Sequence, residues 1–271
     1  MADKGGLIYK KPEFPADAFE GTSDYYQYFR IPYPQILIEK LFELVKPVQR
    51  ELLIDLACGP GRLTFPLADK FNRVIAVDRD AGMIRTGMKS AEASNVENIK
   101  WFAGDAEDLD IDEGTADLVT VGDAFDRLDQ EMILEKSYNW LKPGGCFAIV
   151  GMYAIWRGEE KWHSVVNESV QKWSTLSPIL SVTEFRNYGH LLEGKNFKDV
   201  VSEQFEFLNT HTLDSIIGYL YSTSRCSKKV LGNNADEFEA ELRTKLSGIN
   251  SSGIFEEKVK CGFTLGRKTF S

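Results

Sequence analysis

The sequence predicts an α/β fold in which a doubly wound, mostly parallel sheet of seven strands carries a helical cap insertion. Three observations support this prediction. Between residues 51 and 151, short apolar runs alternate with amphipathic stretches of ten or more residues, as strands and helices do in a parallel sheet. A turn with two glycines, IDLACGPG at residues 54–61, ends the first apolar run. Near the C-terminus, residues 204–213 and 255–268 alternate apolar and polar side chains like half-buried strands.

The expected elements follow in order along the chain. Behind Pro34, apolar residues at helical spacing predict a helix that ends near Val45 and covers the sheet. Short apolar runs then predict five parallel strands, at residues 51–57, 73–78, 98–104, 116–122 and 145–151. The amphipathic stretches between them predict helices at residues 62–71, 81–94 and 130–141.

The chain changes character after residue 151. Helical patterns occupy residues 157–173, 214–224 and 235–246, whereas residues 177–197 are too irregular to assign. We expect the residues between the fifth strand and the late strands to form a cap over one edge of the sheet. The expected parts are an N-terminal segment with the covering helix (1–48), a Rossmann-like core (49–151), the cap insertion (152–200) and the C-terminal part of the core sheet with its helices (201–271).

Length and composition narrow the class of protein. With 271 residues and 43% hydrophobic side chains, the chain is long enough for one main domain with a substantial core. It has no run of about 20 apolar residues that would cross a bilayer, and its start lacks the pattern of a secretory signal. We therefore expect a soluble, cytoplasmic protein without a membrane partner.

The cysteines, the histidines and the net charge indicate which ligands and binding partners to expect. Four scattered cysteines and three histidines without ligand spacing predict reduced thiols, structural or surface histidines and no metal site. The net charge of −9 disfavours a nucleic-acid partner, which would require a basic surface. The same acidity favours a cationic small molecule, although many acidic proteins are acidic only for solubility.

The glycine turn and two acidic residues mark a candidate ligand site. Ligands of open parallel sheets bind beyond the carboxyl ends of the strands, where Gly59 and Gly61 would let the backbone turn sharply beside a ligand. Asp78 ends the second strand, where a carboxylate accepts both hydroxyls of a ribose. Asp105 follows the third strand and can accept from an adenine amino group. A glycine turn alone fits a tight connection equally well, but the three features together predict a ligand that contains adenosine.

The residues of the turn disfavour two common nucleotide sites. The dinucleotide fingerprint G-x-G-x-x-G requires glycine where this chain has Ala57 and Arg62, and the turn lacks the lysine and hydroxyl residue of a P-loop. DLACGPG instead resembles the first motif of class I S-adenosylmethionine-dependent methyltransferases, with Ala57 in place of the first glycine. Three later segments, VDRDAGMI, GDAEDL and LKPGGCFAI, resemble further motifs of that family.

This resemblance implies S-adenosylmethionine as the cofactor and S-adenosylhomocysteine as the product. It implies that Asp78 binds the ribose, that Arg79 and Met83 lie beside the adenine, and that Asp105 and the Ala106 amide contact the base. Arg30 would pair with the methionine carboxylate. The cofactor-binding residues expected on this basis are Tyr28, Arg30, Asp55, Ala57, Cys58, Gly59, Gly61, Asp78, Arg79, Met83, Asp105, Ala106 and Gly122.

Four other segments resemble a subgroup of that family that methylates small molecules: YYQYFRIPYP, GDAFDRLD, IWRG and IGYLYSTS. The subgroup includes trans-aconitate methyltransferases and, with a closer resemblance, aminoglycoside N-methyltransferases of the gentamicin N-methyltransferase type. It implies methyl transfer to an amine of a cationic small molecule, such as an aminoglycoside or amino sugar in antibiotic biosynthesis, by a monomer or homodimer. The alternatives are methylation of a small carboxylic acid or hydroxyl compound, and a non-catalytic cofactor sensor.

The segment VGDAFDRLD at residues 121–129 extends the fourth strand and should border the methyl acceptor. DNA and protein-glutamine N-methyltransferases have Asn-Pro-Pro-Tyr or a relative of it here, which this chain lacks, so nucleic-acid methylation is not expected. Related enzymes commonly have histidine at the position of Asp126. We expect Asp126 to orient a cationic amine and relay its proton, and we expect Phe125 to form a wall of the site where the methyl group is transferred. Alternatively, the Asp126 side chain caps the N-terminus of the next helix.

The predicted cap supplies two candidate acceptor-binding residues. Trp156 lies just beyond the end of the fifth strand, and Glu159 belongs to the first turn of the expected helix. Trp162 and Trp173 are 11 positions apart, about three helical turns, so one apolar face explains both without a ligand.

Overall fold

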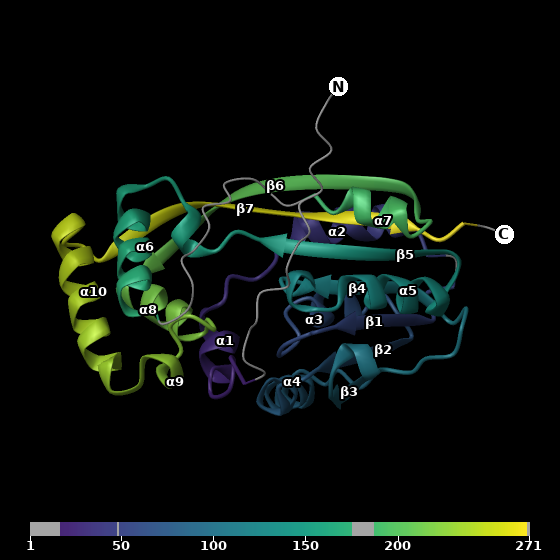
Figure 1. Ribbon diagram of the computed structural model, residues 1–271, viewed down its shortest axis with the longest axis horizontal. Coiled ribbons are helices and arrows are strands. Elements are labelled where there is room, and N and C mark those ends of the chain that lie inside the picture. Colours follow the sequence, from purple (N-terminus) through teal and green to yellow (C-terminus); the bar gives the residue numbers. More distant parts are fainter. Residues whose placement is uncertain (1–16, 48, 175–186, 270–271) are drawn as a thin grey trace, which may run out of the picture.

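The computed structural model describes residues 17–47, 49–174 and 187–269. In this part of the chain, seven strands form one sheet in the order β3-β2-β1-β4-β5-β7-β6 (Figure 1). The strands are β1 (Leu52–Leu56), β2 (Arg73–Asp78), β3 (Ile99–Ala103), β4 (Ala116–Gly122), β5 (Leu141–Met152), β6 (Lys198–Thr212) and β7 (Ile254–Arg267). The predicted doubly wound, seven-stranded sheet is confirmed.

The first five strands run parallel and the last two do not. β1 pairs in parallel with β2 and β4, β2 pairs with β3, and β4 pairs with β5. β7 runs antiparallel to both β5 and β6. The chain moves outward from β1 to β3 and returns to the other side of β1 as β4, so the strand order reverses between β1 and β4. Ligands of such sheets bind at the carboxyl ends of the strands beside this reversal.

Helices cover both faces of the parallel strands. α2 (Gln35–Val45) and α3 (Thr64–Ala68) pack on one face, where Leu41 belongs to the shared core. α5 (Gln130–Trp140) and α7 (Gly189–Gly194) contribute to the core of the other face. α4 (Ala81–Ala93) packs beside β2 and β3. Both faces of the central strands β1 and β4 are therefore buried, which explains why their sequences are continuous apolar runs, whereas β3 at the edge of the sheet is only partly buried.

A separate apolar core lies at the far end of β6 and β7. Figure 1 shows these long strands continuing past the parallel strands to a group of helices. The group comprises α6 (Lys161–Trp173), α8 (Leu213–Tyr221), α9 (Lys228–Leu231) and α10 (Ala235–Ile249), and its core includes Phe255 and Val259 of β7. We call these helices and the attached strand ends the cap. The cap thus draws on chain segments before and after residue 200.

A short helix, α1 (Ser23–Phe29), joins the sheet to the cap because it packs against both α4 and α8. Gly218 of α8 permits the close approach, since a Cβ at this position would lie 2.3 Å from the ring of Phe29. Among the described residues, no helix is both long enough and apolar enough to cross a membrane.

Candidate active site

A cavity of about 770 Å³ opens at the carboxyl edge of the parallel strands. The loop after β1, the end of β2, the segment after β3 and the end of β4 all contribute to its walls. Its lining residues are Ala18, Phe19, Tyr26, Ala57, Gly59, Asp78, Arg79, Asp80, Met83, Asp105, Ala106, Glu107, Asp108, Gly122, Asp123, Ala124, Arg127, Leu128, Asp129 and Met132. The strand ends that the sequence predicts to bind a ligand thus line the same cavity.

The loop after β1 depends on left-handed backbone conformations. Ala57, Gly59 and Gly61 have φ angles of 51°, 58° and 99°. A Cβ at Gly61 would lie 2.8 Å from the ring of Phe65, whereas one at Gly59 would have only Tyr26 nearby, at 3.8 Å. Gly61 therefore serves packing below the loop, and Gly59 keeps the backbone accessible from the cavity.

Asp55 supports this loop from below, inside the protein. Its side chain is completely buried and accepts hydrogen bonds from the hydroxyls of Thr64, at 2.5 Å, and Thr120, at 2.8 Å. Burial raises the pKa of Asp55 to about 6, although the two hydrogen bonds oppose this rise. Asp55, Cys58 and Gly61 were expected to bind the cofactor but are not among the residues that line the cavity.

Asp78 lies in the cavity wall and connects two loops. Its Oδ2 accepts from the Gly59 amide at 2.8 Å and its Oδ1 from the Asp80 amide at 2.9 Å. Burial raises the pKa of Asp78, although these backbone hydrogen bonds oppose the rise. Each oxygen retains acceptor capacity, so the carboxylate can still accept hydroxyl groups from a ligand.

The neighbouring wall carries the residues expected at an adenine. Met83 lies at the start of α4, whose N-cap Asp80 accepts from the amides of Gly82 and Met83. Arg79 pairs with Asp105, with 3.1 Å between Nε and Oδ1, and both side chains are about half exposed. Together with Ala106, these residues line the part of the cavity beyond β2 and β3.

The end of β4 presents Asp123, a cavity residue that the sequence analysis missed. Its Oδ1 accepts from the Met152 amide at 2.7 Å, and its Oδ2 accepts from the Tyr33 hydroxyl at 2.8 Å and from Arg62 Nη1 at 3.2 Å. Asp123 also has a left-handed φ of 53°. The predicted acceptor segment 121–129 pointed to this region, but Asp123 itself had no signal in a single sequence.

Asp126 does not line the cavity, although Gly122, Asp123, Ala124 and Arg127 do. It lies in a short 3-10 helix, Phe125–Arg127, and the alternative role as cap of the next helix was wrong. α5 begins only at Gln130, and the side chain of Asp129 caps it by accepting from the Met132 amide at 3.1 Å. The extended backbone of Leu128 separates the 3-10 turn from α5.

The expected acceptor residues lie outside this cavity. Phe125 is buried and packs edge-on against Phe147 and Tyr188. Trp156 packs against the cap core, and Glu159 is an exposed side chain paired with Lys260 at 3.3 Å. The roles of Phe125, Trp156 and Glu159 toward an acceptor remain predictions.

The tryptophans of α6 follow the simpler expectation. Trp162 is buried in the cap core and donates from Nε1 to the backbone oxygen of Glu256 at 3.1 Å. Trp173 packs against the same core. Their predicted role in apolar packing is therefore confirmed.

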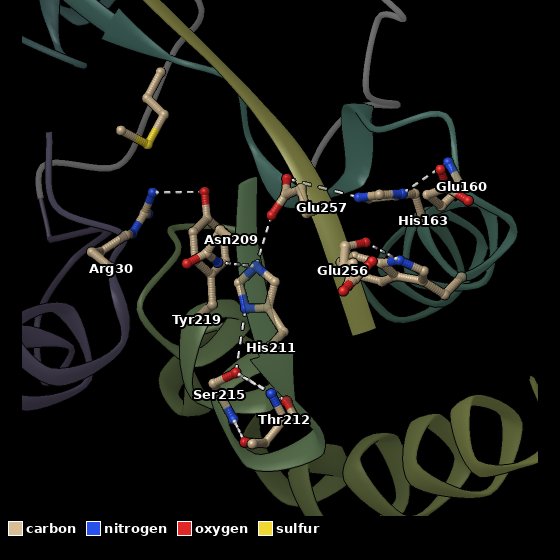
Figure 2. A network of polar contacts seen from close by, with 12 residues as sticks. Arg30, Glu160, His163, Asn209, His211, Thr212, Ser215, Tyr219, Glu256 and Glu257 are labelled. Atoms are coloured by element: carbon tan, nitrogen blue, oxygen red, sulfur yellow. Dashed lines mark hydrogen bonds and ion pairs between the residues drawn. The ribbon is translucent and has the colours of Figure 1, made fainter. Parts of the chain in front are cut away.

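Tyr28 and Arg30, the expected cofactor residues of the N-terminal segment, differ in their surroundings. Tyr28 is 79% exposed and does not line the cavity. Arg30 donates to the Ser222 hydroxyl at 2.8 Å. It also donates to the Tyr219 hydroxyl at 3.3 Å, as Figure 2 shows. Its guanidinium also lies over the rings of Tyr219 and Tyr26, and Tyr26 lines the cavity. Arg30 is thus one side chain away from the cavity.

Comparison with known proteins supports a methyltransferase. Residues 53–145 match the family described as "Methyltransferase domain". A proposed methyltransferase of Dictyostelium discoideum is 24% identical over 242 residues, which cover 87% of this chain and 88% of that protein. A ubiquinone/menaquinone biosynthesis C-methyltransferase of Zymomonas mobilis is 28% identical over 125 residues, 46% of this chain and half of that protein.

Solved structures support the fold. The structure of a proposed type II methyltransferase from Anaeromyxobacter dehalogenans has a TM-score of 0.63 at 20% identity, covering 89% of this chain and 98% of that chain. Its likeness to this protein concerns the fold alone. The matched domain, the seven-stranded sheet and the cavity walled by the expected strand ends together support a class I S-adenosylmethionine-dependent methyltransferase with S-adenosylmethionine as its cofactor.

Proposed function

We propose that this methyltransferase transfers a methyl group to an amine of a small molecule, with an aminoglycoside or a similar amino sugar as the favoured acceptor. The observation that carries the proposal is the charge of the cavity wall. Acidic residues outnumber basic ones there by seven to two: Asp78, Asp80, Asp105, Glu107, Asp108, Asp123 and Asp129 against Arg79 and Arg127. Such a wall favours a cationic acceptor over an anionic one.

The residues present fit the cofactor. Asp78 would accept the ribose hydroxyls, and Asp105 with the Ala106 amide would contact the adenine, with Met83 beside it. Gly59 leaves the loop backbone open to the ligand. When bound, S-adenosylmethionine supplies a methyl group whose carbon–sulfur bond breaks, the electron pair going to sulfur, as the acceptor nitrogen forms the new carbon–nitrogen bond.

The chain's own residues would position the acceptor and handle its proton. An amine attacks only as the free base, so a proton must leave the nitrogen before or after transfer. Asp126 is the residue that we propose for receiving this proton, since it follows the end of β4 by one short turn. The remaining contribution is alignment of the nitrogen behind the methyl carbon in a confined space.

The test is a binding and transfer experiment with the purified protein. We expect calorimetry to detect S-adenosylhomocysteine binding, and methyl-labelled S-adenosylmethionine to label amines in a panel of 2-deoxystreptamine, kanamycin and glucosamine. The comparison panel contains trans-aconitate, citrate and catechol. Label only on the acids or on catechol would contradict an amine acceptor. Cofactor binding without transfer to any compound would instead favour a sensor.

A further inference from the structure

Asp123 is the one carboxylate at the end of β4 that both lines the cavity and is held in place by three different segments of the described chain. Its side chain is 18% exposed. An ionised carboxylate offers about four acceptor positions. The Met152 amide uses one position on Oδ1, while Tyr33 and Arg62 use two on Oδ2. One acceptor position therefore remains, on Oδ1.

The partners of Asp123 keep it a hydrogen-bond acceptor. Burial raises the pKa of the Tyr33 hydroxyl well above its usual value, and the nearby Asp123 charge adds to this rise, so Tyr33 remains a donor. Arg62 neutralises the carboxylate through an ion pair of 3.2 Å and also donates to the Ile31 carbonyl. These three donors hold the carboxylate in one orientation, which suits it to orienting a ligand.

The backbone around Asp123 is built for this arrangement. A left-handed φ of 53° is unfavourable for a residue with a side chain, and such conformations gather at functional sites. The hydrogen bond from the Asp123 amide to the Val150 carbonyl, at 2.9 Å, holds the conformation. Space is also limited beside it, because a Cβ on Gly122 would lie 3.0 Å from the Tyr33 hydroxyl.

We propose that Asp123 determines acceptor specificity by accepting, at Oδ1, a hydrogen bond from the nitrogen that receives the methyl group. This inference rests on the proposed amine acceptor. One N–H of the amine would donate to Asp123. This hydrogen bond would turn the lone pair of the nitrogen toward the methyl carbon. The proton that the nitrogen loses goes to Asp126 or to water.

The test uses sinefungin, an S-adenosylmethionine analogue that carries an amine-bearing carbon in place of the methylated sulfur. Its amino group stands at the point of transfer, so its affinity reports on a carboxylate there without requiring an identified acceptor. We expect Asp123→Asn to weaken sinefungin binding about tenfold, the worth of one charge-assisted hydrogen bond, and to leave the Kd of S-adenosylhomocysteine within about twofold. Asp69→Asn, on the exposed surface, is the matched control and should change neither.

Tyr33→Phe provides a second variant in case Asp123→Asn fails to fold, which circular dichroism would show. It retains the carboxylate and removes one bond that orients it. We expect sinefungin to bind about threefold more weakly and S-adenosylhomocysteine to bind as before. Equal sinefungin affinities in the wild type and the folded variants would overturn the role of Asp123. An absence of amine methylation in the panel would overturn the proposed function instead, whatever the sinefungin result.

Discussion

Asp55 illustrates at the scale of one residue how the site is supported from inside the sheet. Its carboxyl group lies in β1 and accepts from Thr64 of α3 and Thr120 of β4. It thus ties the helix that follows the glycine turn to two strands of the sheet. Because the group is completely buried, ionisation costs more in the folded protein than in water.

This burial predicts a dependence of stability on pH. The pKa of Asp55 is about 6 in the folded protein and 3.8 ordinarily. Between these values the unfolded chain releases a proton that the folded protein retains, so the free energy of unfolding decreases as the pH rises. The contribution of Asp55 to the free energy of unfolding is fully present below pH 3.8 and is lost above about pH 6.

Urea unfolding of wild type and Asp55→Asn at pH 4, 5, 6 and 7 tests the prediction. The asparagine cannot ionise, so the free energy of unfolding of the wild type should fall relative to the variant by about 2.5 kcal/mol between pH 4 and pH 7. Most of this change should be complete near pH 6. A constant difference between the two proteins would show that Asp55 does not titrate in this range.

Asp126→Asn tests the proposed proton acceptor. Because a positioned acid or base typically contributes a hundredfold or more, we expect turnover of the preferred amine to fall about 100-fold with unchanged S-adenosylhomocysteine affinity. The measurement is kcat from methyl-label transfer. A decrease of less than about threefold, below about 1 kcal/mol of barrier, would exclude the role.

Residues differ in how readily a single sequence reveals them. Asp78 and Gly59 were predictable because each is defined by its place at the end of a local apolar run. Asp123 was not, because its partners Tyr33, Arg62 and Met152 lie 90, 61 and 29 positions away. Its left-handed φ depends on those contacts, so the sequence of the neighbouring residues does not predict it.

At the scale of elements, a buried polar cluster joins the strands of the cap to its helices. Figure 2 shows Glu257 of β7 between His211 of β6 and His163 of α6. The distances from Glu257 are 2.7 Å to His211 Nε2 and 3.7 Å to His163 Nε2, and all three side chains are buried. Burial alone would raise the pKa of Glu257, but the histidine hydrogen bonds outweigh it and lower the pKa.

Removing the charge of Glu257 should therefore loosen the cap. We expect Glu257→Gln to lower the free energy of unfolding by about 3 kcal/mol at pH 7, because it leaves two buried histidines without their carboxylate. Glu256→Gln is the matched control, since this neighbour's side chain is exposed. The cost should shrink as the pH falls below the ordinary value of 4.5, where the lowered pKa ceases to stabilise the fold. Equal stabilities of the two variants would refute the prediction.

Elements with a clear apolar face were predictable, and elements without one were not. The pattern behind Pro34 predicted α2, which buries Leu37, Ile38, Leu41 and Val45. α1 was missed as a separate helix because none of its residues is fully buried. β6 starts at Lys198, before the predicted residue 204. Its first residues carry no clear apolar pattern because none of its side chains before His211 is fully buried. The unassigned residues 177–186 lie outside the described part of the chain.

At the scale of the whole molecule, α1 and Arg30 connect the sheet and the cap. α1 packs on α4 and α8, and Arg30 donates to Tyr219 and Ser222, at the end of the cap helix α8. The guanidinium also lies 4.7 Å from the ring centre of Tyr26, a cavity residue. Within residues 17–47, 49–174 and 187–269, Arg30 forms no ion pair with a carboxylate. We propose that the Arg30 guanidinium pairs with the carboxylate of the cofactor.

Arg30→Met separates this role from a purely structural one. S-adenosylhomocysteine carries the carboxylate, whereas 5′-methylthioadenosine has the same nucleoside and sulfur without it. If Arg30 pairs with the carboxylate, the variant should bind S-adenosylhomocysteine at least tenfold more weakly and 5′-methylthioadenosine with nearly unchanged affinity, since a charged hydrogen bond is worth about 1.5–3 kcal/mol.

Calorimetry with both ligands on both proteins supplies the four affinities needed for this comparison. If Arg30 acts only by fastening α1 to the cap, its loss displaces Tyr26 from the cavity and weakens both ligands by the same factor, because neither ligand then loses a contact of its own. Equal losses would thus assign Arg30 to the joint between sheet and cap. A selective loss for S-adenosylhomocysteine would mean that cofactor binding itself bridges the two parts, since Arg30 would then hold the ligand while bonded to α8.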